Sequence, residues 1–127
     1  LSWVQCTGFL SPKEMIAEYS EVDALLFLSK EESYGFPLVE AMFVGLPIVC
    51  PNLPYARTLC GEQAVYFDPD CHESLRQALT LLKSKLDNGW WPDWKNQLAN
   101  IPRDWNTVAR KMSRLASRVN ALVAVAA

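Results

Sequence analysis

The sequence predicts an α/β fold with a mainly parallel sheet. Short apolar runs without polar alternation, such as residues 24–29 and 47–50, are typical of strands covered on both faces. Segments with helical spacing separate these runs, and regular alternation of strand and helix favours parallel pairing. The chain has 127 residues, of which 50% are hydrophobic and 20% charged, so it can bury one core. We therefore expect a single domain over residues 1–127.

The first elements follow from local signals. Residues 3–8, "WVQCTG", form a short β-like run that ends in glycine. A helix begins after Ser11, because Ser11 can cap it, Pro12 suits its first position and Glu14 completes a capping box. This helix extends to about residue 22. The apolar run 24–29 then predicts a strand buried on both faces.

The middle of the chain continues the alternation. Pro37 near the start and Gly45 at the end bound a short helix, "PLVEAMFVG". Buried strands are predicted at 47–50 and 64–69, and the segment between them holds a loop and a short helix. A longer helix follows over 72–86, where leucines recur at helical spacing, at Leu75, Leu79, Leu82 and Leu86.

The last third of the chain differs from the rest. The segment 87–94, "DNGWWPDW", breaks the pattern, and a final helix is expected over 104–123. That helix places apolar residues on one face, at Val108, Met112, Leu115, Val119 and Leu122. We divide the domain into a β/α core, 1–86, and a terminal helical segment, 87–127.

Composition excludes several classes of protein. No apolar run approaches the ~20 residues of a membrane span, and no basic segment followed by an apolar stretch opens the sequence. We expect a cytoplasmic location. The four cysteines match neither a zinc knuckle nor a dense disulfide framework, and we interpret them as reduced thiols. Cys6 and Cys50 lie in apolar runs and are expected to be small core residues. We predict no metal site and no nucleic-acid partner.

The candidate site is the stretch "KEESYGFPLVEAMFVG", residues 30–45. It follows a predicted strand and leads into a helix, which is where open α/β sheets bind ligands. Gly35 allows close approach of the backbone, and the helix that begins near Phe36 or Pro37 offers unpaired N–H groups to a phosphate. Glu32 and Glu40 could accept hydrogen bonds from sugar hydroxyls in the same crevice. The alternative is that both glutamates are solvated surface residues.

The segment "ESYGFPLVEAMFVGLPIVCPNLP" resembles the signature of retaining group 1, or family 4, glycosyltransferases of the GT-B fold. The flanking segments extend the resemblance over about residues 3–86, in the style of O-antigen mannosyltransferases. It implies a Rossmann-like sheet that is part of a GT-B C-terminal, donor-binding domain. It also implies transfer of a mannose-like hexose from a GDP- or UDP-linked donor to a saccharide or lipid-linked acceptor, without a metal cofactor.

The resemblance assigns roles to individual residues. Glu32 becomes the catalytic residue beside the donor sugar, and Glu40 the ligand of the ribose hydroxyls. Backbone amides around Gly35, Phe36, Pro37 and Leu38 would hold the donor sugar or its diphosphate. Two positions depart from the pattern: Ser33 replaces a usual glycine, and Thr58 replaces a usual glutamate.

The resemblance also implies missing parts. The Arg and Lys that meet the diphosphate, the first two strands of the domain and the acceptor-binding N-terminal domain are absent from this sequence. We therefore expect no turnover by this chain alone, and strand edges covered by another copy or by rearranged pairing. The alternatives are a non-catalytic nucleotide-binding or interaction module, and an unrelated dinucleotide-binding domain. The latter ranks last, because no Gly-x-Gly-x-x-Gly turn is present.

Residues outside the signature have simpler interpretations. His72 at a helix start is expected to be a surface or capping residue. Arg110, Lys111, Arg114 and Arg118 form a basic stripe, which we interpret as solvated. The alternative is a patch that faces the acceptor or lies against the inner face of the membrane, where the protein would be peripheral. The tryptophans are expected to pack the terminal helices rather than to stack on sugars, namely Trp90, Trp91, Trp94 and Trp105.

Overall fold

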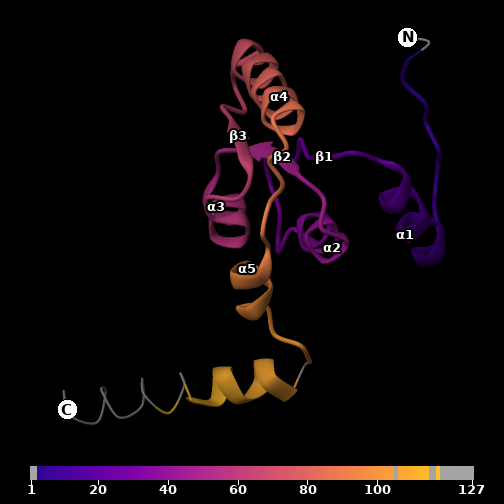
Figure 1. The fold of residues 1–127 in the computed structure, drawn as a ribbon. Coiled ribbons are helices and arrows are strands. Elements are labelled where there is room, and N and C mark those ends of the chain that lie inside the picture. Colours follow the sequence, from indigo (N-terminus) through magenta and orange to yellow (C-terminus); the bar gives the residue numbers. More distant parts are fainter. Residues whose placement is uncertain (1–2, 105, 115–116, 118–127) are drawn as a thin grey trace.

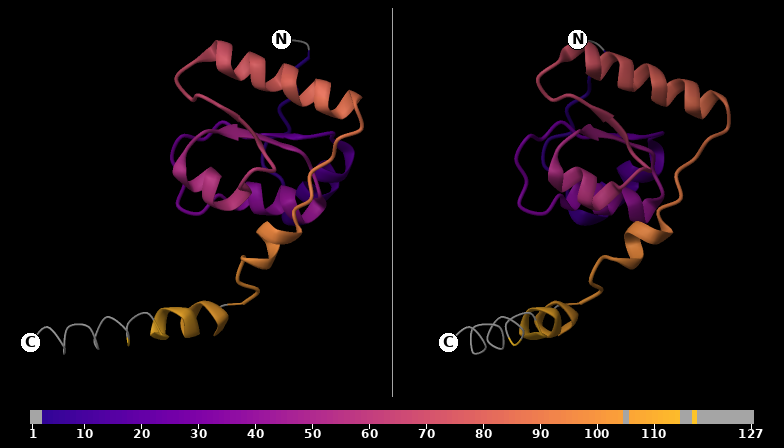
Figure 2. Two further views of the ribbon diagram at one scale, coloured as in Figure 1. Left: turned by 60° about the vertical axis from the view of Figure 1, so that its left-hand side comes forward. Right: turned by 90° about the vertical axis from the view of Figure 1, so that its left-hand side faces the viewer.

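The computed structural model describes residues 3–104, 106–114 and 117, and in them the chain forms three layers around a parallel sheet. The sheet has the order β1-β2-β3, with β1 at Leu25–Leu26, β2 at Ile48–Pro51 and β3 at Val65–Phe67. Helix α4 covers one face, and α1, α2 and α3 lie on the other (Figures 1 and 2). The predicted α/β class with a mainly parallel sheet is confirmed.

Strand β2 is the centre of the sheet and is buried along its whole length. Its side chains alternate between two clusters, as the two-residue period of a strand requires. Ile48 and Cys50 point into the cluster beneath α2 and α3, while Val49 packs with Ala78 and Leu82 of α4. A strand enclosed in this way must be apolar at every position, which explains the run in the sequence.

Two helices connect the strands on one face. Helix α2 (Phe36–Val44) joins β1 to β2, and α3 (Pro54–Cys60) joins β2 to β3. Right-handed crossovers that advance in one direction along a sheet place their helices on the same face. Helix α4 (His72–Asp87) crosses to the opposite face and packs on β2 and β3 (Figure 2).

Helix ends follow the predicted signals. In α1 (Pro12–Glu21), the Ser11 hydroxyl accepts from the Glu14 amide and the Glu14 carboxylate accepts from the Ser11 amide, so the capping box is formed. Gly45 ends α2 in the left-handed conformation, and its amide donates to the carbonyls of Ala41 and Met42. His72 is the first residue of α4 and is exposed, as expected.

Two predicted strands differ from the structure. Residues 3–8 form no strand; Trp3 is 79% exposed, and the segment runs beside α1, away from the sheet (Figure 1). In the part of the chain that the structure describes, no strand lies alongside this segment to pair with its backbone. Cys6 is consequently exposed rather than a core residue, whereas Cys50 is buried as expected.

The strand predicted over 24–29 is reduced to two residues. Only Leu25–Leu26 form β1, and Leu26 and Leu28 are 42% and 55% exposed. The prediction of burial on both faces was wrong here, because β1 is the outer strand of the described sheet and α4 packs on β2 and β3. Leu25 and Phe27 do pack against the cluster on the α2 side.

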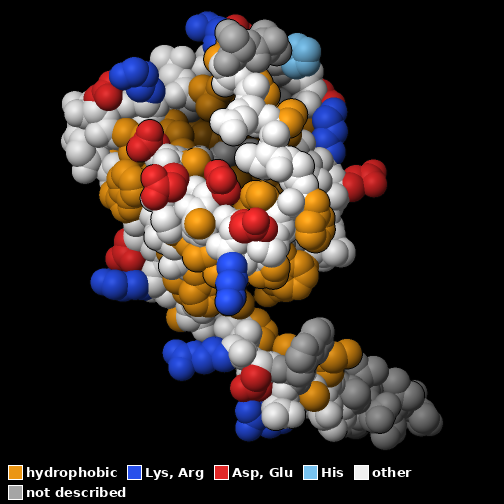
Figure 3. Space-filling model, turned by 90° about the vertical axis from the view of Figure 1, so that its right-hand side faces the viewer, with side chains coloured by type: hydrophobic (Ala, Val, Ile, Leu, Met, Phe, Trp, Pro, Cys, Tyr) orange, Lys and Arg blue, Asp and Glu red, His pale blue; other side chains and the backbone are white. Residues whose placement is uncertain are grey.

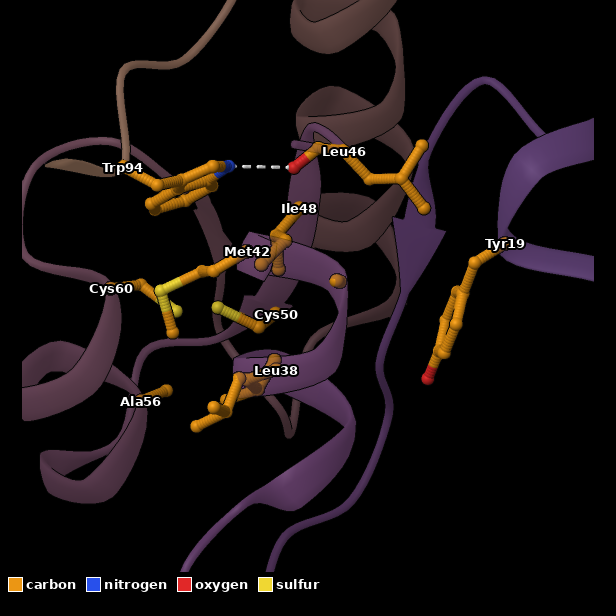
Figure 4. Close-up of a cluster of buried hydrophobic side chains, with 11 residues drawn as sticks. Tyr19, Leu38, Met42, Leu46, Ile48, Cys50, Ala56, Cys60 and Trp94 are labelled. Atoms are coloured by element: carbon orange, nitrogen blue, oxygen red, sulfur yellow. Dashed lines mark hydrogen bonds between the residues drawn. The ribbon is translucent and has the colours of Figure 1, made fainter. Parts of the chain in front are cut away.

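The segment after α4 is extended and runs from the face of the sheet that α4 covers to the opposite side, where α5 lies (Figure 1). Trp94 is 4% exposed, and its indole Nε1 donates to the carbonyl of Leu46 at 2.9 Å (Figure 4). Trp91 is 56% exposed but donates to the carbonyl of Gly45 at 2.8 Å. Trp90 is half-buried beneath the Lys85 ammonium. The predicted packing role is confirmed for Trp94 and Trp90, which lie in the two clusters, but not for Trp91, whose ring is mostly exposed. Trp105 lies outside the described residues.

The C-terminal helices are only partly predicted. Helix α5 (Lys95–Ala99) was not anticipated as a separate element. Residues 106–114 are helical, as expected, and Met112 on the predicted apolar face is 65% exposed. Val108 on the same face is half-buried, and its other three positions, Leu115, Val119 and Leu122, lie outside the described residues. In α4, Leu82 is buried but Leu79 is 40% exposed, and Ala78 takes the inward position instead.

Candidate functional site

The candidate site lies where the strands end at their carboxyl edge. The loop after β1 contacts the segments that follow the other two strands. The Lys30 ammonium pairs with the Asp70 carboxylate in the loop after β3, and the Tyr55 hydroxyl of α3 donates to the carbonyl of Ser29. In an α/β sheet this edge is the usual place for ligands. The predicted location of the candidate stretch on a strand-to-helix loop is confirmed.

Gly35 is the residue that turns this loop into α2. Its φ of +85° lies in the left-handed region, which favours glycine. A Cβ at this position would lie 3.0 Å from Cδ1 of Leu59 and 3.4 Å from Cδ1 of Leu38, so both the backbone conformation and the available space select glycine. The start of α2 is therefore held close against α3.

The first turn of α2 presents few free amides. Pro37 has no N–H, and the Leu38 amide donates to the Gly35 carbonyl at 3.0 Å. Within the described residues, the amides of Gly35 and Phe36 donate to no protein acceptor. The Phe36 side chain is 63% exposed and its ring lies 5.0 Å from that of Tyr34, whereas the Leu38 side chain is fully buried. The anion-binding capacity of this helix start therefore belongs to two amides.

Glu40 is exposed on α2, about one turn after its start. Its carboxylate Oε2 accepts a hydrogen bond from the Tyr19 hydroxyl of α1 at 3.0 Å. Burial, followed by the hydrogen bond to Glu40, raises the pKa of Tyr19 to about 12, so Tyr19 stays a donor near neutral pH. Figure 4 shows the Tyr19 side chain extending from α1 beside α2.

Glu32 has a different environment from Glu40. It is half-buried in the loop after β1 and lies near Tyr55, whose pKa is raised to about 12 by burial, by Cys50 and by Glu32. In the part of the chain that the structure describes, no hydrogen bond joins Glu32 to Glu40. Whether the two carboxylates act on one ligand, as the sequence predicts, stays a prediction.

Sequence reasoning missed the polar neighbours of the signature. Tyr19 was part of a predicted helix but had no assigned role, since nothing in the sequence relates it to Glu40. Arg57 lies over the Tyr66 ring at 3.7 Å and donates from Nε to Asn52 at 2.7 Å. Thr58, the departure noted in the sequence, is exposed, and its hydroxyl donates to the carbonyl of Pro54.

Two other surfaces border the site. A cavity of about 260 Å³ opens between Tyr34, Leu59 and Gln97. The side-chain oxygen of Gln97, Oε1, is buried and accepts no hydrogen bond from the described residues. Figure 3 shows acidic side chains gathered on the face where α1 lies, next to hydrophobic ones.

Among the described residues, no three His, Cys, Asp or Glu side chains are grouped as metal ligands usually are. None of the described helices is long and apolar enough to cross a bilayer.

Comparison with known proteins identifies the family. The model of the family "Glycosyl transferases group 1" matches residues 3–88, which contain β1 to β3, α1 to α4 and the whole candidate stretch. The chain belongs to the group 1 glycosyltransferases. The expected family and its Rossmann-like parallel sheet are thus confirmed. No solved structure matched the chain.

Curated relatives of this group 1 domain are mannosyltransferases by name. O-antigen chain mannosyltransferase B of Escherichia coli is 25% identical over 69% of the chain and 23% of that protein. Serotype-specific mannosyltransferase WbdA of Escherichia coli is 28% identical over 80% of the chain and 14% of that protein. O-antigen chain mannosyltransferase RfbU of Salmonella typhimurium (strain LT2) is 30% identical over 61% of the chain and 22% of that protein. The chain therefore spans less than a quarter of the length of these relatives.

Proposed function

We propose that this chain is the nucleotide-sugar-binding part of a retaining glycosyltransferase. The whole enzyme would transfer a mannose-like hexose from a GDP- or UDP-linked donor to a saccharide or lipid-linked acceptor. The observation that carries the proposal is the start of α2 at the carboxyl edge of the sheet. There a left-handed glycine, two amides that donate to no acceptor among the described residues, and an exposed carboxylate one turn later occur together. Membership in the family and the names of the relatives support it.

The helix start is suited to a diphosphate. The amides of Gly35 and Phe36 are oriented by the first turn of α2, and the positive end of the helix dipole adds to their attraction for an anion. When the bond to the sugar breaks, negative charge grows on the departing diphosphate, and fixed N–H donors then stabilise it more than they stabilised the bound donor. Gly35 is required because any side chain there would displace Leu59.

The glutamates are suited to hydroxyl groups rather than to phosphate. An ionised carboxylate accepts hydrogen bonds from a ribose or hexose but repels an anion. We assign Glu40 to the ribose hydroxyls, with Oε1 open to them while Oε2 accepts from Tyr19. We assign Glu32 to the sugar side, in the loop that leaves β1.

The proposal for transfer concerns the whole enzyme. Cationic groups at the carboxyl edge are already engaged in the described structure, Lys30 with Asp70 and Arg57 with Asn52 and Glu62. Neutralising a diphosphate would need further positive charge, and the acceptor needs a surface of its own. We expect the chain alone to bind donor nucleotides and not to complete transfer.

The test is calorimetric titration of the chain with GDP, UDP, GDP-mannose and UDP-glucose. Glu40→Ala should weaken the binding of the preferred nucleotide by about 1–3 kcal/mol, since hydroxyls lose their charged acceptor. Glu73→Ala is the matched control: it also removes a helical carboxylate, but from α4 on the opposite face of the sheet.

The outcomes separate the two candidate functions. Binding of one base that Glu40→Ala weakens and Glu73→Ala does not supports the donor-site assignment. Two results together would favour the non-catalytic binding module: the chain still binds a nucleotide after Glu40→Ala, and the same substitution in a full-length relative leaves sugar transfer unchanged. A chain that is folded and binds none of the four ligands contradicts the proposal.

A further inference from the structure

The contact between Tyr19 and Glu40 joins two elements that are separate in sequence. Tyr19 lies on α1, before the first strand, and Glu40 on α2, after it; their side chains meet at 3.0 Å. Tyr19 is 8% exposed and packs in the cluster that includes Leu38 and Ala41 of α2. Packing holds the phenol ring, so the position of its hydroxyl oxygen beside Glu40 is held as well.

An exposed glutamate otherwise has considerable rotational freedom. Its side chain has several rotamers of similar energy, and a ligand that selects one of them loses affinity for ordering the others. A hydrogen bond from a fixed donor removes much of that freedom before the ligand arrives. It occupies one lone pair of Oε2 and leaves the remaining acceptor sites of the carboxylate open.

We propose that Tyr19 is a positioning residue for Glu40, which holds the carboxylate in the orientation that accepts the two ribose hydroxyls of a nucleotide. This inference rests on the proposed function of Glu40. Tyr19 itself touches no part of the ligand. Because its hydroxyl remains protonated, it donates to Glu40 throughout the neutral range.

A purely structural role for Tyr19 must be distinguished from positioning. Tyr19 is the buried residue of α1, so its ring also attaches α1 to the body. Tyr19→Phe keeps the ring and removes only the hydroxyl, which leaves the attachment largely intact. The matched control is Tyr66→Phe, because the Tyr66 hydroxyl donates to the backbone carbonyl of Gly61 and not to a carboxylate.

The experiment measures the affinity of the full chain and its variants for the better-bound of GDP and UDP, and for the 2′,3′-dideoxy form of that nucleotide. Positioning predicts that Tyr19→Phe weakens nucleotide binding about three- to tenfold, the usual effect of one such hydrogen bond. The dideoxy form should bind Tyr19→Phe and the unsubstituted chain equally, because it has no hydroxyl for Glu40 to accept. Adding Tyr19→Phe to Glu40→Ala should cause no further loss.

Each other outcome overturns the inference in a recognisable way. If Glu40→Ala weakens binding and Tyr19→Phe does not, Tyr19 does not position Glu40, while the proposed function stands. The role of Tyr19 is structural if any of three results is found. Tyr19→Phe lowers the affinity for the dideoxy form as much as for the nucleotide, it lowers the affinity further in the Glu40→Ala background, or it changes the affinity by the same factor as Tyr66→Phe. If neither nucleotide binds the unsubstituted chain, or Glu40→Ala has no effect, the assignment of Glu40 fails and the positioning role with it.

Discussion

Replacing Gly35 by alanine tests whether the start of α2 depends on close contact with α3. Gly35 has φ +85°, and Gly45 at the other end of the same helix has φ +88°, so alanine costs about 1–2 kcal/mol in backbone strain at either site. The lower entropy of the unfolded chain offsets about 0.4–1 kcal/mol of that strain, again equally at both sites. Gly45→Ala is therefore a control for everything except the surrounding space.

The space around the two glycines differs. A Cβ at Gly45 would meet nothing within 4 Å, whereas at Gly35 it would lie 3.0 Å from Leu59 Cδ1, closer than the 3.4 Å at which ordinary contact begins. Leu59 is half-buried and must move, which costs about 1 kcal/mol, at the low end of the range for overpacking. We expect a net loss of about 1 kcal/mol for Gly45→Ala and about 2 kcal/mol for Gly35→Ala.

Urea unfolding followed by tryptophan fluorescence measures both values on the same chain. With a slope of about 1–2 kcal/mol per molar urea, the midpoint of Gly35→Ala should lie about 0.5–1 M below that of Gly45→Ala. Adding Leu59→Ala should reduce the gap between the two glycine variants, since it removes the atom that the new Cβ meets. Equal midpoints for the two single variants would refute the argument that α3 excludes a side chain at Gly35.

Three further predictions concern the core and its titration. Trp94→Phe should destabilise the chain by about 1–3 kcal/mol, because a buried carbonyl loses its donor, while Trp91→Phe at an exposed contact should cost less; urea midpoints check both. The pKa of Tyr19 is raised from 10.0 to about 12, so stability should hold below pH 10 and fall as the pH rises through 12, and Tyr19→Phe should flatten that fall in unfolding measured across this range. A hydrogen bond with a neighbouring thiol and burial raise the pKa of Cys50, so a thiol reagent should modify exposed Cys6 at once and Cys50 only on unfolding, as mass mapping of the labelled peptides would show.

The elements that could be predicted are those whose signals are local. Ser11, Pro12 and Glu14 form a capping box that needs no tertiary contact, and the structure confirms it. Strand β2 was also recognisable, because a strand enclosed on both faces is apolar at every position. Both predictions depend on residues next to one another in the chain.

The errors occur where a neighbour decides the outcome. Residues 3–8 carry the composition of a strand but have no partner strand among the described residues. In the segment 24–29, Ala24 packs in the cluster on the α4 side, whereas Leu26 and Leu28 are exposed. A single sequence contains no record of which strand is outermost. The same limit applies to Trp94, whose donor bond to Leu46 closes a separation of 48 residues.

The candidate site shows the same division. Its location and the need for Gly35 follow from the short segment that contains them, and the family match supports the reading of that segment. Tyr19 could not be found in this way, because its relation to Glu40 exists only after α1 and α2 have packed together. The roles of Glu32 and Glu40 toward a ligand stay predictions.

The weak attachment of α1 has a consequence for the dynamics of the domain. Tyr19 is the buried residue that this helix contributes, whereas α4 buries Ala78 and Leu82 against two strands. Opening of α1 therefore exposes little apolar surface and costs far less than global unfolding, so it should form a separate low-stability unit. Amide hydrogens of α1 should exchange with solvent well before those of α4, and a ligand held by Glu40 should slow that exchange by making departure of α1 less favourable.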